Sequence, residues 1–401
     1  MKKLFLLVCA AACMMTVQAQ PITKDGGLTM QQIGMLRGSY QSNPTNKALR
    51  NAINSNDISK LAVNYDNGTA FDAHLSNTVP SKAITNQESS GRCWMFTGMN
   101  VLRNKAIRKH DLPDDFQFSQ CYTFFWDQLE KSNLFLQAIL DNRAKSMEDE
   151  TVQWLFKNPL SDGGQFTGVA NLITKYGAVP KDVMPETYNS NHTSRISELI
   201  KLRLREDGLK LREMSNNKGV TEQKLQATKM EMLETIYRML AYTFGEPPTE
   251  FTWTQRNAKG DVVSTEKYTP MYFSCDVAKF LDREKGFMDM DNYDYASLMG
   301  TTFNMDKKQR VQTFASGSSH AMTLVAVDLD ADGKPLKWMV ENSWGNNYGY
   351  KGCLIMTNDW FDNYMFRLVV EKKYIPAKLL KMFDQKPIML PSWDPMFQPE
   401  E

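Results

Sequence analysis

Apolar residues recur at helical spacing in several stretches of the chain. The stretch after Cys93 has this spacing and no proline, which predicts a helix that begins near Ser90. Its apolar positions are Trp94, Met95, Val101, Leu102 and Ala106. The same criterion predicts a helix over about 46–54, buried helices within 116–139 and a helix over about 167–175.

A second pattern predicts a β-hairpin late in the chain. Two apolar runs, 318–327 and 336–345, flank a polar turn rich in aspartate. Symmetry about Ala331 places position 320 opposite position 342. The pattern therefore predicts that His320 lies beside the Asn342 side chain at the open end of the hairpin.

Between these regions the composition changes. From Ser194 to about Thr243 the pattern is helical and carries charges of both signs, with interruptions at Gly208 and over 216–219. A segment with balanced charges of this kind is typical of a solvated helical hairpin. A more specific interpretation is an inserted arm that contacts another subunit. Alternation over 251–272 predicts strands.

The first residues have the three regions of a secretory signal. Two lysines are followed by an uncharged run from Leu4 to Met15 and then by Val17-Gln-Ala19. We therefore expect residues 1–19 to be a signal peptide, and the protein to be periplasmic or secreted. Lipidation at Cys13 is a less favoured alternative. No later apolar run is long enough to span a bilayer.

Composition narrows the function classes. Among 401 residues, 42% are hydrophobic and 23% are charged, with a net charge of +1, which argues against a general nucleic-acid or acidic-membrane binder. After residue 19 the cysteines are few, scattered and never in a CxxC pair, so we predict neither a disulfide framework nor a structural zinc site. They are Cys93, Cys121, Cys275 and Cys353. No cofactor is predicted.

Four side chains together fit thiol hydrolysis. A cysteine in the first turn of a helix is held where the macrodipole favours its thiolate. Such a nucleophile also needs an imidazole, a group that orients the imidazole, and donors for the oxyanion. Cys93, His320, Asn342 and Gln87 can fill these roles, with the Cys93 backbone N–H as the second donor. Alone, Cys93 could be a small buried hydrophobe and His320 a core histidine.

Several motifs then resemble a known family. The Gln-to-Cys-Trp, His-Ala and Asn-Ser-Trp-Gly segments, in that order, resemble the papain-like cysteine peptidases. The chain is most similar to the bleomycin hydrolase and aminopeptidase C family within them, and the similarity covers nearly everything after the leader. The segments that carry it are Ser90–Trp94, Lys175–Lys181, Met184–Tyr188, Phe273–Val277, His320–Met322, Val340–Gly345 and Trp393–Met396.

The resemblance implies an α+β fold of the papain type. This fold has two lobes, one helical and one resembling a β-barrel. Residues 20–401 would form one peptidase domain, with a helical insertion over about 194–243 and a C-terminal arm over about 391–401 that lies toward the active site.

The resemblance also implies a role for each site residue. Cys93 would be the nucleophile and His320 the general base, and later the acid for the leaving amine. Asn342 would orient the imidazole, and Trp344 would shield that hydrogen bond from water. Gln87 would donate a hydrogen bond to the oxyanion.

Other residues are implied to bind substrate. Gly163 and Gly164 would let the substrate backbone approach closely, although a plain turn would explain them too. The arm would receive the free amino group of a peptide substrate. Its end, with Glu400, Glu401 and the terminal carboxylate, is more acidic than the family pattern, and a frayed tail is the alternative.

The resemblance therefore favours a cysteine aminopeptidase that acts on peptides with a free N-terminus. An endopeptidase or acyltransferase with an open cleft is the alternative among enzymes, and a non-catalytic binding protein is the alternative outside them. Family members form hexamers through helical insertions. The insertion over 194–243 is short for that role, so no subunit number is predicted.

Overall fold

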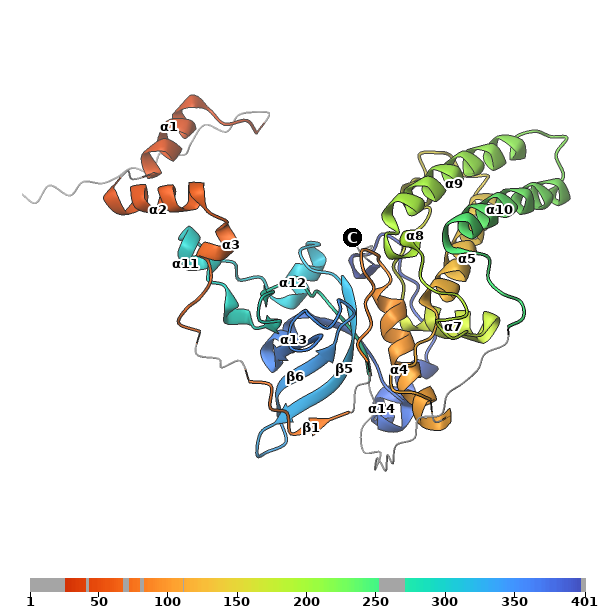
Figure 1. Ribbon diagram of the computed structural model, residues 1–401. Helices are drawn as coiled ribbons and strands as arrows, with labels where there is room; N and C mark the ends of the chain where they lie inside the picture. The colour runs from red at the N-terminus through yellow and green to blue at the C-terminus, as the bar shows by residue number, and fades with distance from the viewer. Residues whose placement is uncertain are drawn as a thin grey trace, which may run out of the picture. The chain divides into compact units, whose positions relative to one another are not determined.

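The computed structural model describes residues 26–40, 43–67, 72–79, 83–110, 112–251 and 271–397 (Figure 1). The predicted signal peptide, Cys13, Glu400 and Glu401 lie outside the described residues. Most of the stretch predicted as strands, 251–272, is also outside them.

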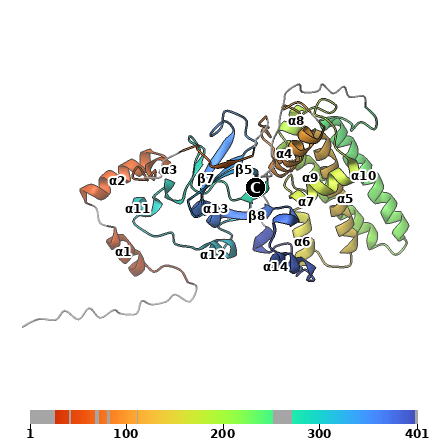
Figure 2. The ribbon, with the colours of Figure 1, turned by 90° about the horizontal axis from the view of Figure 1, so that it is seen from below.

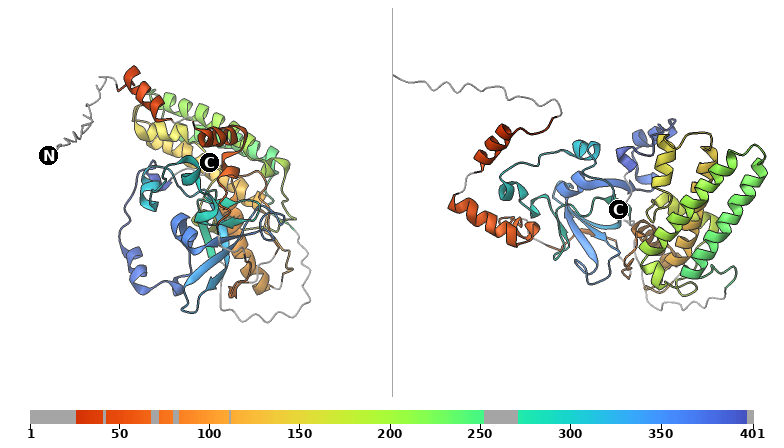
Figure 3. Two further views of the ribbon diagram at one scale, coloured as in Figure 1. Left: turned by 90° about the vertical axis from the view of Figure 1, so that its left-hand side faces the viewer. Right: turned by 90° about the horizontal axis from the view of Figure 1, so that it is seen from above.

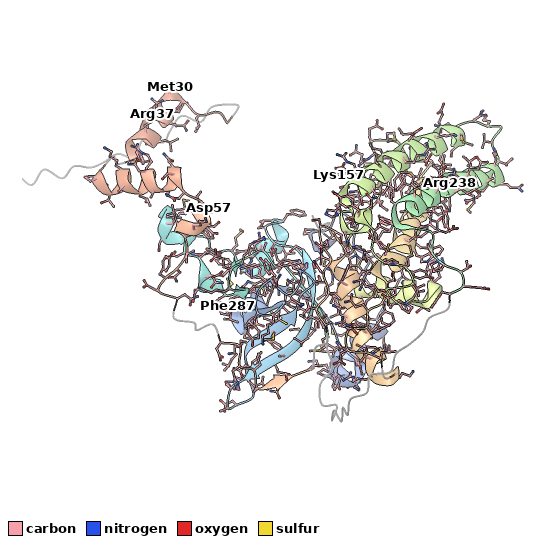
Figure 4. All side chains as sticks on the ribbon, in the orientation of Figure 1. Met30, Arg37, Asp57, Lys157, Arg238 and Phe287 are labelled. Atoms are coloured by element: carbon pink, nitrogen blue, oxygen red, sulfur yellow. The ribbon has the colours of Figure 1, made fainter. Side chains whose placement is uncertain are left out.

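The chain divides into two compact units, each described by itself. The first ends at Val63 and the second begins at Asn64. The first contains α1 (Met30–Ser39), α2 (Pro44–Ser55) and α3 (Ile58–Leu61). The Asn43 side chain accepts a hydrogen bond from the Asn46 N–H and so caps α2, which confirms the helix predicted over 46–54. Figure 4 labels Met30 and Arg37 on α1.

Helices dominate the first half of the second unit. They are α4 (Cys93–His110), α5 (Gln120–Asp141), α6 (Glu150–Lys157), α7 (Phe166–Tyr176), α8 (Tyr188–Asn191), α9 (Ser194–Ser215) and α10 (Glu222–Phe244). The aromatic-rich α5 packs against α7, α9 and α10 and contributes many residues to one hydrophobic core. Helices were predicted at α4, α5 and α7, and the structure confirms them.

The charged segment predicted as a helical hairpin is α9 and α10, which lie side by side (Figures 1 and 3). The predicted break over 216–219 is confirmed, but the break predicted at Gly208 is wrong because α9 continues through it. A Cβ on Gly208 would lie 3.2 Å from ring atoms of both Phe135 and Phe156. This glycine therefore permits close helix packing.

Within the described residues, eight strands form one sheet, and all of them except β1 lie in the second half of this unit. They are β1 (Asn77–Thr78), β2 (Met271–Cys275), β3 (Leu281–Asp282), β4 (Phe287–Met288), β5 (His320–Leu329), β6 (Pro335–Glu341), β7 (Cys353–Thr357) and β8 (Met365–Val369). Their order is β3-β4-β7-β6-β5-β2-β8, and β1 also pairs with β5.

Short helices accompany the sheet and the C-terminal segment. They are η1 (Met290–Asn292), α11 (Tyr295–Met299), α12 (Lys307–Gln312), α13 (Asn358–Tyr364), η2 (Lys372–Tyr374), α14 (Ala377–Leu380), η3 (Lys381–Asp384) and η4 (Pro395–Phe397). Helix α13 lies against β6 and β7 (Figures 1 and 2). No helix of the described residues is long and apolar enough to cross a membrane.

The predicted hairpin is β5 and β6, but near its open end the predicted register is wrong by two residues, and over Ala326–Asp328 it is wrong by three. Thr323 pairs with Glu341, so the same register would place Trp344, and not Asn342, opposite His320. Because side chains alternate with a period of two along a strand, a shift of two residues keeps each side chain on its face. His320 and Asn342 therefore still meet.

None of the four described cysteines takes part in a disulfide, and all four are buried. Burial raises the pKa of Cys121 and of Cys353 to about 12, and the nearby carboxylates of Glu186 and Glu341, respectively, act in the same direction. These two thiols are therefore protonated and unreactive at neutral pH.

Helix α4 packs against β5 along a seam that contains a buried ion pair. An Arg103 guanidinium nitrogen lies 3.5 Å from a Glu341 carboxylate oxygen, and both side chains are almost fully buried. The Asn100 amide donates to the same carboxylate oxygen at 2.9 Å. Burial lowers the pKa of Arg103, and the negative charge of Glu341 opposes that effect.

We expect Glu341→Ala to lower the free energy of unfolding by about 3–5 kcal/mol, because it leaves the Arg103 charge buried without its partner. Equilibrium unfolding in urea measures the change. Glu371→Ala is the matched control, since Glu371 pairs with Lys105 on the same helix at an exposed position and should contribute little. Equal effects of the two substitutions would contradict this account.

Candidate active site

Cys93 is the first residue of α4. The helix therefore begins three residues later than Ser90, and Cys93 lies in its first turn as predicted. The N–H groups of Met95 and Phe96 donate to the Arg92 carbonyl at 2.9 and 3.0 Å, which closes this turn. Cys93 is only 3% exposed. Its sulfur thus lies where the helix macrodipole favours a negative charge.

His320 and Asn342 form the predicted pair. The His320 Nε2 atom lies 2.8 Å from Asn342 Oδ1, and both residues are buried. The same Oδ1 also accepts from the Ser343 N–H at 2.8 Å, which identifies it as the amide oxygen. Because this oxygen can only accept, Nε2 must donate, and a neutral imidazole then has an unprotonated Nδ1. The ring is therefore set up as a base through Nδ1.

Burial also determines the charge of this imidazole. It lowers the pKa of His320 to about 4, although the Asn342 hydrogen bond acts in the opposite direction. The Trp344 ring lies 4.8 Å from the imidazole ring, centroid to centroid, and its shielding of the hydrogen bond from water stays a prediction. His320 is therefore neutral at pH 7 unless a nearby anion, such as a thiolate, stabilises its charged form.

The seam between α4 and β5 brings Cys93 to the same place as His320. Thr97, one helical turn after Cys93 on the same face, donates to the Ala321 carbonyl at 3.0 Å. Ala321 directly follows His320. Cys275 pairs with His320 across β2 and β5, and its pKa is raised by burial first and also by Asp276 and Cys93. Cys93 and His320 therefore lie on the two sides of this seam.

Gln87 connects the segment before α4 to the end of β6. Its N–H donates to the Ser343 carbonyl at 2.8 Å, and its Oε1 accepts from the Ser343 hydroxyl. Its Nε2 donates to the Ser90 carbonyl at 2.7 Å, which uses one of the two N–H bonds of that nitrogen. Asn86 pairs with Trp344 in an antiparallel bridge. The structure thus brings Gln87 together with Cys93, His320, Asn342 and Trp344.

The predicted glycine pair lies beside Trp94. A Cβ on Gly164 would lie 2.6 Å from the Trp94 ring, closer than such atoms approach. The Trp94 indole N–H donates to the Asp162 carbonyl at 2.7 Å. Packing against Trp94 therefore requires a glycine at 164, whatever binds there. Glu401, the remaining predicted site residue, lies outside the described residues.

Sequence reasoning gave no role to two residues of this region. Ser343 lay inside the Asn-Ser-Trp-Gly segment, where its position next to Asn342 was a signal that could have been used. Lys131 comes from α5, and its Nζ donates to the Gly163 carbonyl at 2.6 Å. No local pattern around Lys131 predicts that contact.

Comparison with known proteins identifies the family of this chain. Residues 27–274 and 265–397 match the Peptidase C1-like family. The chain belongs to this family. The peptidase is 32% identical to bleomycin hydrolase of Homo sapiens over 93% of this chain and 98% of that protein. It is also 32% identical to aminopeptidase C of Lactobacillus delbrueckii subsp. lactis over 89% of this chain and 95% of that protein.

A solved structure supports the fold. The crystal structure of PepW from Lactobacillus rhamnosis HN001 (DR20) matches the peptidase with a TM-score of 0.83 and 32% identity. The match covers 93% of this chain and 99% of PepW. The predicted family resemblance and the predicted α+β, papain-like fold are therefore confirmed.

The buried imidazole makes stability depend on pH. An unfolded histidine has a pKa near 6.5, whereas the pKa of His320 is about 4. Between these values the unfolded chain binds the extra proton, so stability is fully present above pH 6.5 and is lost as the pH falls to about 4. The loss is on the order of 3 kcal/mol.

We expect His320→Gln to reduce this loss, because glutamine does not titrate. Urea unfolding between pH 4 and 7 measures it. The two proteins compared, with and without His320→Gln, should both carry Cys93→Ala, so that no thiolate charge acts on the imidazole. If the free energy of unfolding fell equally with pH in both proteins, His320 would not be the source of the loss.

Proposed function

We propose that this protein is a cysteine aminopeptidase that releases N-terminal residues from peptides. The observation that carries the proposal is the 2.8 Å contact between His320 Nε2 and Asn342 Oδ1, on the same seam as Cys93 at the start of α4. This arrangement leaves Nδ1 to accept a proton from the thiol. A scaffold protein would not require that combination.

The proposed reaction has two halves. His320 Nδ1 takes the proton of the Cys93 thiol, and the thiolate attacks the carbonyl carbon of the first peptide bond. The oxyanion of the tetrahedral intermediate accepts hydrogen bonds from the second Nε2–H of Gln87 and from the Cys93 N–H. The imidazolium then protonates the leaving amine. Water, activated by His320, hydrolyses the remaining thioester and frees Cys93.

The C-terminal segment supports the choice of an aminopeptidase. Its last described helix, η4, contacts α12, which ends eight residues before His320. The next residues include Glu400 and Glu401. We propose that their carboxylates receive the α-amino group of the substrate, because opposite charges attract strongly where water is partly excluded. Gly163 and Gly164 would contact the substrate backbone.

Two other activities would use the same residues and can be distinguished from an aminopeptidase by experiment. With an open cleft the same residues would act as an endopeptidase or acyltransferase, and peptides with a blocked N-terminus would then be substrates.

We also propose, from residues 1–19, that the protein is exported. Detection in the periplasm or medium, with Gln20 as the first residue, tests that separately.

Cys93→Ala should lower kcat by at least about 10³-fold, because no other group can form the thioester. Release of the N-terminal residue from an unblocked tetrapeptide, followed by chromatography, measures it. Cys121→Ala is the matched control and should retain activity, since that thiol is buried and protonated. Hydrolysis that persists in Cys93→Ala would overturn the mechanism.

Acetylation of the substrate N-terminus should lower kcat/KM by roughly 10–100-fold, because a hydrogen bond to a charged group contributes about 1.5–3 kcal/mol. Deletion of residues 397–401 should abolish most of the difference between free and acetylated peptides. Equal kinetics of the full-length and shortened proteins on both peptides would remove the arm from the proposal.

A further inference from the structure

We infer that Lys131 is a positioning residue, which holds the 161–164 loop in the orientation needed to bind the backbone of a peptide substrate. The inference rests on the proposed peptidase function and deepens it. Lys131 lies on α5, outside every segment that suggested the site from sequence.

The ammonium group of Lys131 is surrounded by acceptors. Its Nζ donates to the Gly163 carbonyl at 2.6 Å, to the Ser161 carbonyl at 2.9 Å and to the Asp127 carboxylate at 2.8 Å. These three contacts use all three of its N–H bonds. The same nitrogen lies 5.1 Å from the centroid of the Trp94 ring, within the range of a cation–π contact.

Neighbouring groups hold the ammonium in place. Asp127 is 5% exposed, and its carboxylate also accepts from the Gln128 amide at 3.0 Å. Gln128 donates in addition to the Ser161 carbonyl at 3.2 Å. Because Asp127 lies one helical turn before Lys131 on α5, the helix itself sets the position of the charge.

Three consecutive carbonyls of the loop, those of residues 161–163, are therefore held by side chains. Lys131 holds those of residues 161 and 163, and Trp94 holds that of Asp162 at 2.7 Å. No cis peptide bond is present among the described residues, and in a trans peptide the carbonyl and the next N–H point in opposite directions. Fixing the Gly163 carbonyl toward Lys131 thus directs the Gly164 N–H away from α5.

The loop also lies directly beside the nucleophile. A Cβ on Gly91 would lie 2.8 Å from the Asp162 Cβ, and one on Gly164 would meet the Trp94 ring. Both contacts are with the segment that contains Cys93. A bound peptide whose carbonyl carbon lies at Cys93 therefore passes close to the Gly164 N–H. Rotation of this peptide plane would remove that donor from the substrate without moving Cys93.

The test uses Lys131→Met in the full-length protein, because methionine keeps an apolar stem beside Trp94 and removes the three donors. We expect kcat/KM for an unblocked tetrapeptide to fall roughly 10–100-fold, mainly through KM, since small misplacements of binding groups have effects of this size. The rate of Cys93 alkylation by iodoacetamide should stay within about twofold of wild type, because this small reagent needs no loop contact.

The matched control is Lys175→Met. Lys175 also pairs with a carboxylate of α5, that of Glu130, but it is exposed and holds no loop carbonyl. Lys131→Arg should restore part of the lost activity, because its guanidinium keeps the charge and the donors. If Lys131→Met is too unstable to assay, Asp127→Asn provides the test and should raise KM in the same direction.

Two results would overturn the inference. One is a kcat/KM for Lys131→Met that equals that of Lys175→Met. The other is a fall in alkylation as large as the fall in kcat/KM, which would mean that Lys131 acts on the nucleophile through Trp94. If wild type and Lys175→Met are themselves inactive on peptides while Cys93 is alkylated normally, the proposed function fails instead.

Discussion

The structure of the site depends on the seam where the first turns of α4 meet the β5–β6 hairpin. Cys93 and His320, the proposed nucleophile and base, are far apart in sequence, and each alone is an ordinary buried side chain. Three contacts across the seam fix their alignment. The Thr97 hydroxyl donates a hydrogen bond to the Ala321 carbonyl, and the Gln87 N–H donates one to the Ser343 carbonyl. The third contact is the ion pair of Arg103 and Glu341. The first two set the positions of Cys93 and Asn342, and the third anchors the strand directly before Asn342.

Burial gives the site its chemistry as well as its shape. The same desolvation that makes Cys121 and Cys353 inert lowers the pKa of His320, so the imidazole is neutral at physiological pH and has an unprotonated Nδ1. Cys121 also lies in the first turn of a helix, α5, but its thiol donates to the Phe244 carbonyl at 3.5 Å. Cys93 differs because its helix packs against β5, the strand that begins at His320. The described residues thus contain four buried cysteines, and the one suited to attack is the one that the fold brings to the imidazole.

Much of this could be predicted from the sequence, because local patterns carry it. The helix after Cys93 and the hairpin that joins His320 to Asn342 follow from apolar periodicity, and the family resemblance supplied the two-lobed fold. Near the open end the hairpin register was wrong by two residues, yet the pairing of His320 with Asn342 survived because strand faces repeat every two residues. The continuity of α9 through Gly208, the packing of Gly164 against Trp94 and the role of Lys131 were not predictable. Each depends on a partner distant in sequence, namely the rings of Phe135, Phe156 and Trp94 and the carbonyls of the 161–164 loop.

The buried ion pair of Arg103 and Glu341 also constrains how this protein can evolve. Loss of either charge leaves the other in a dry environment, where an unpaired charge is strongly unfavourable. Replacement of both by apolar residues of similar volume would remove that penalty. Single substitutions at either position are therefore disfavoured, and the two positions are tied to one another: descendants of this chain should keep both charges or lose them together.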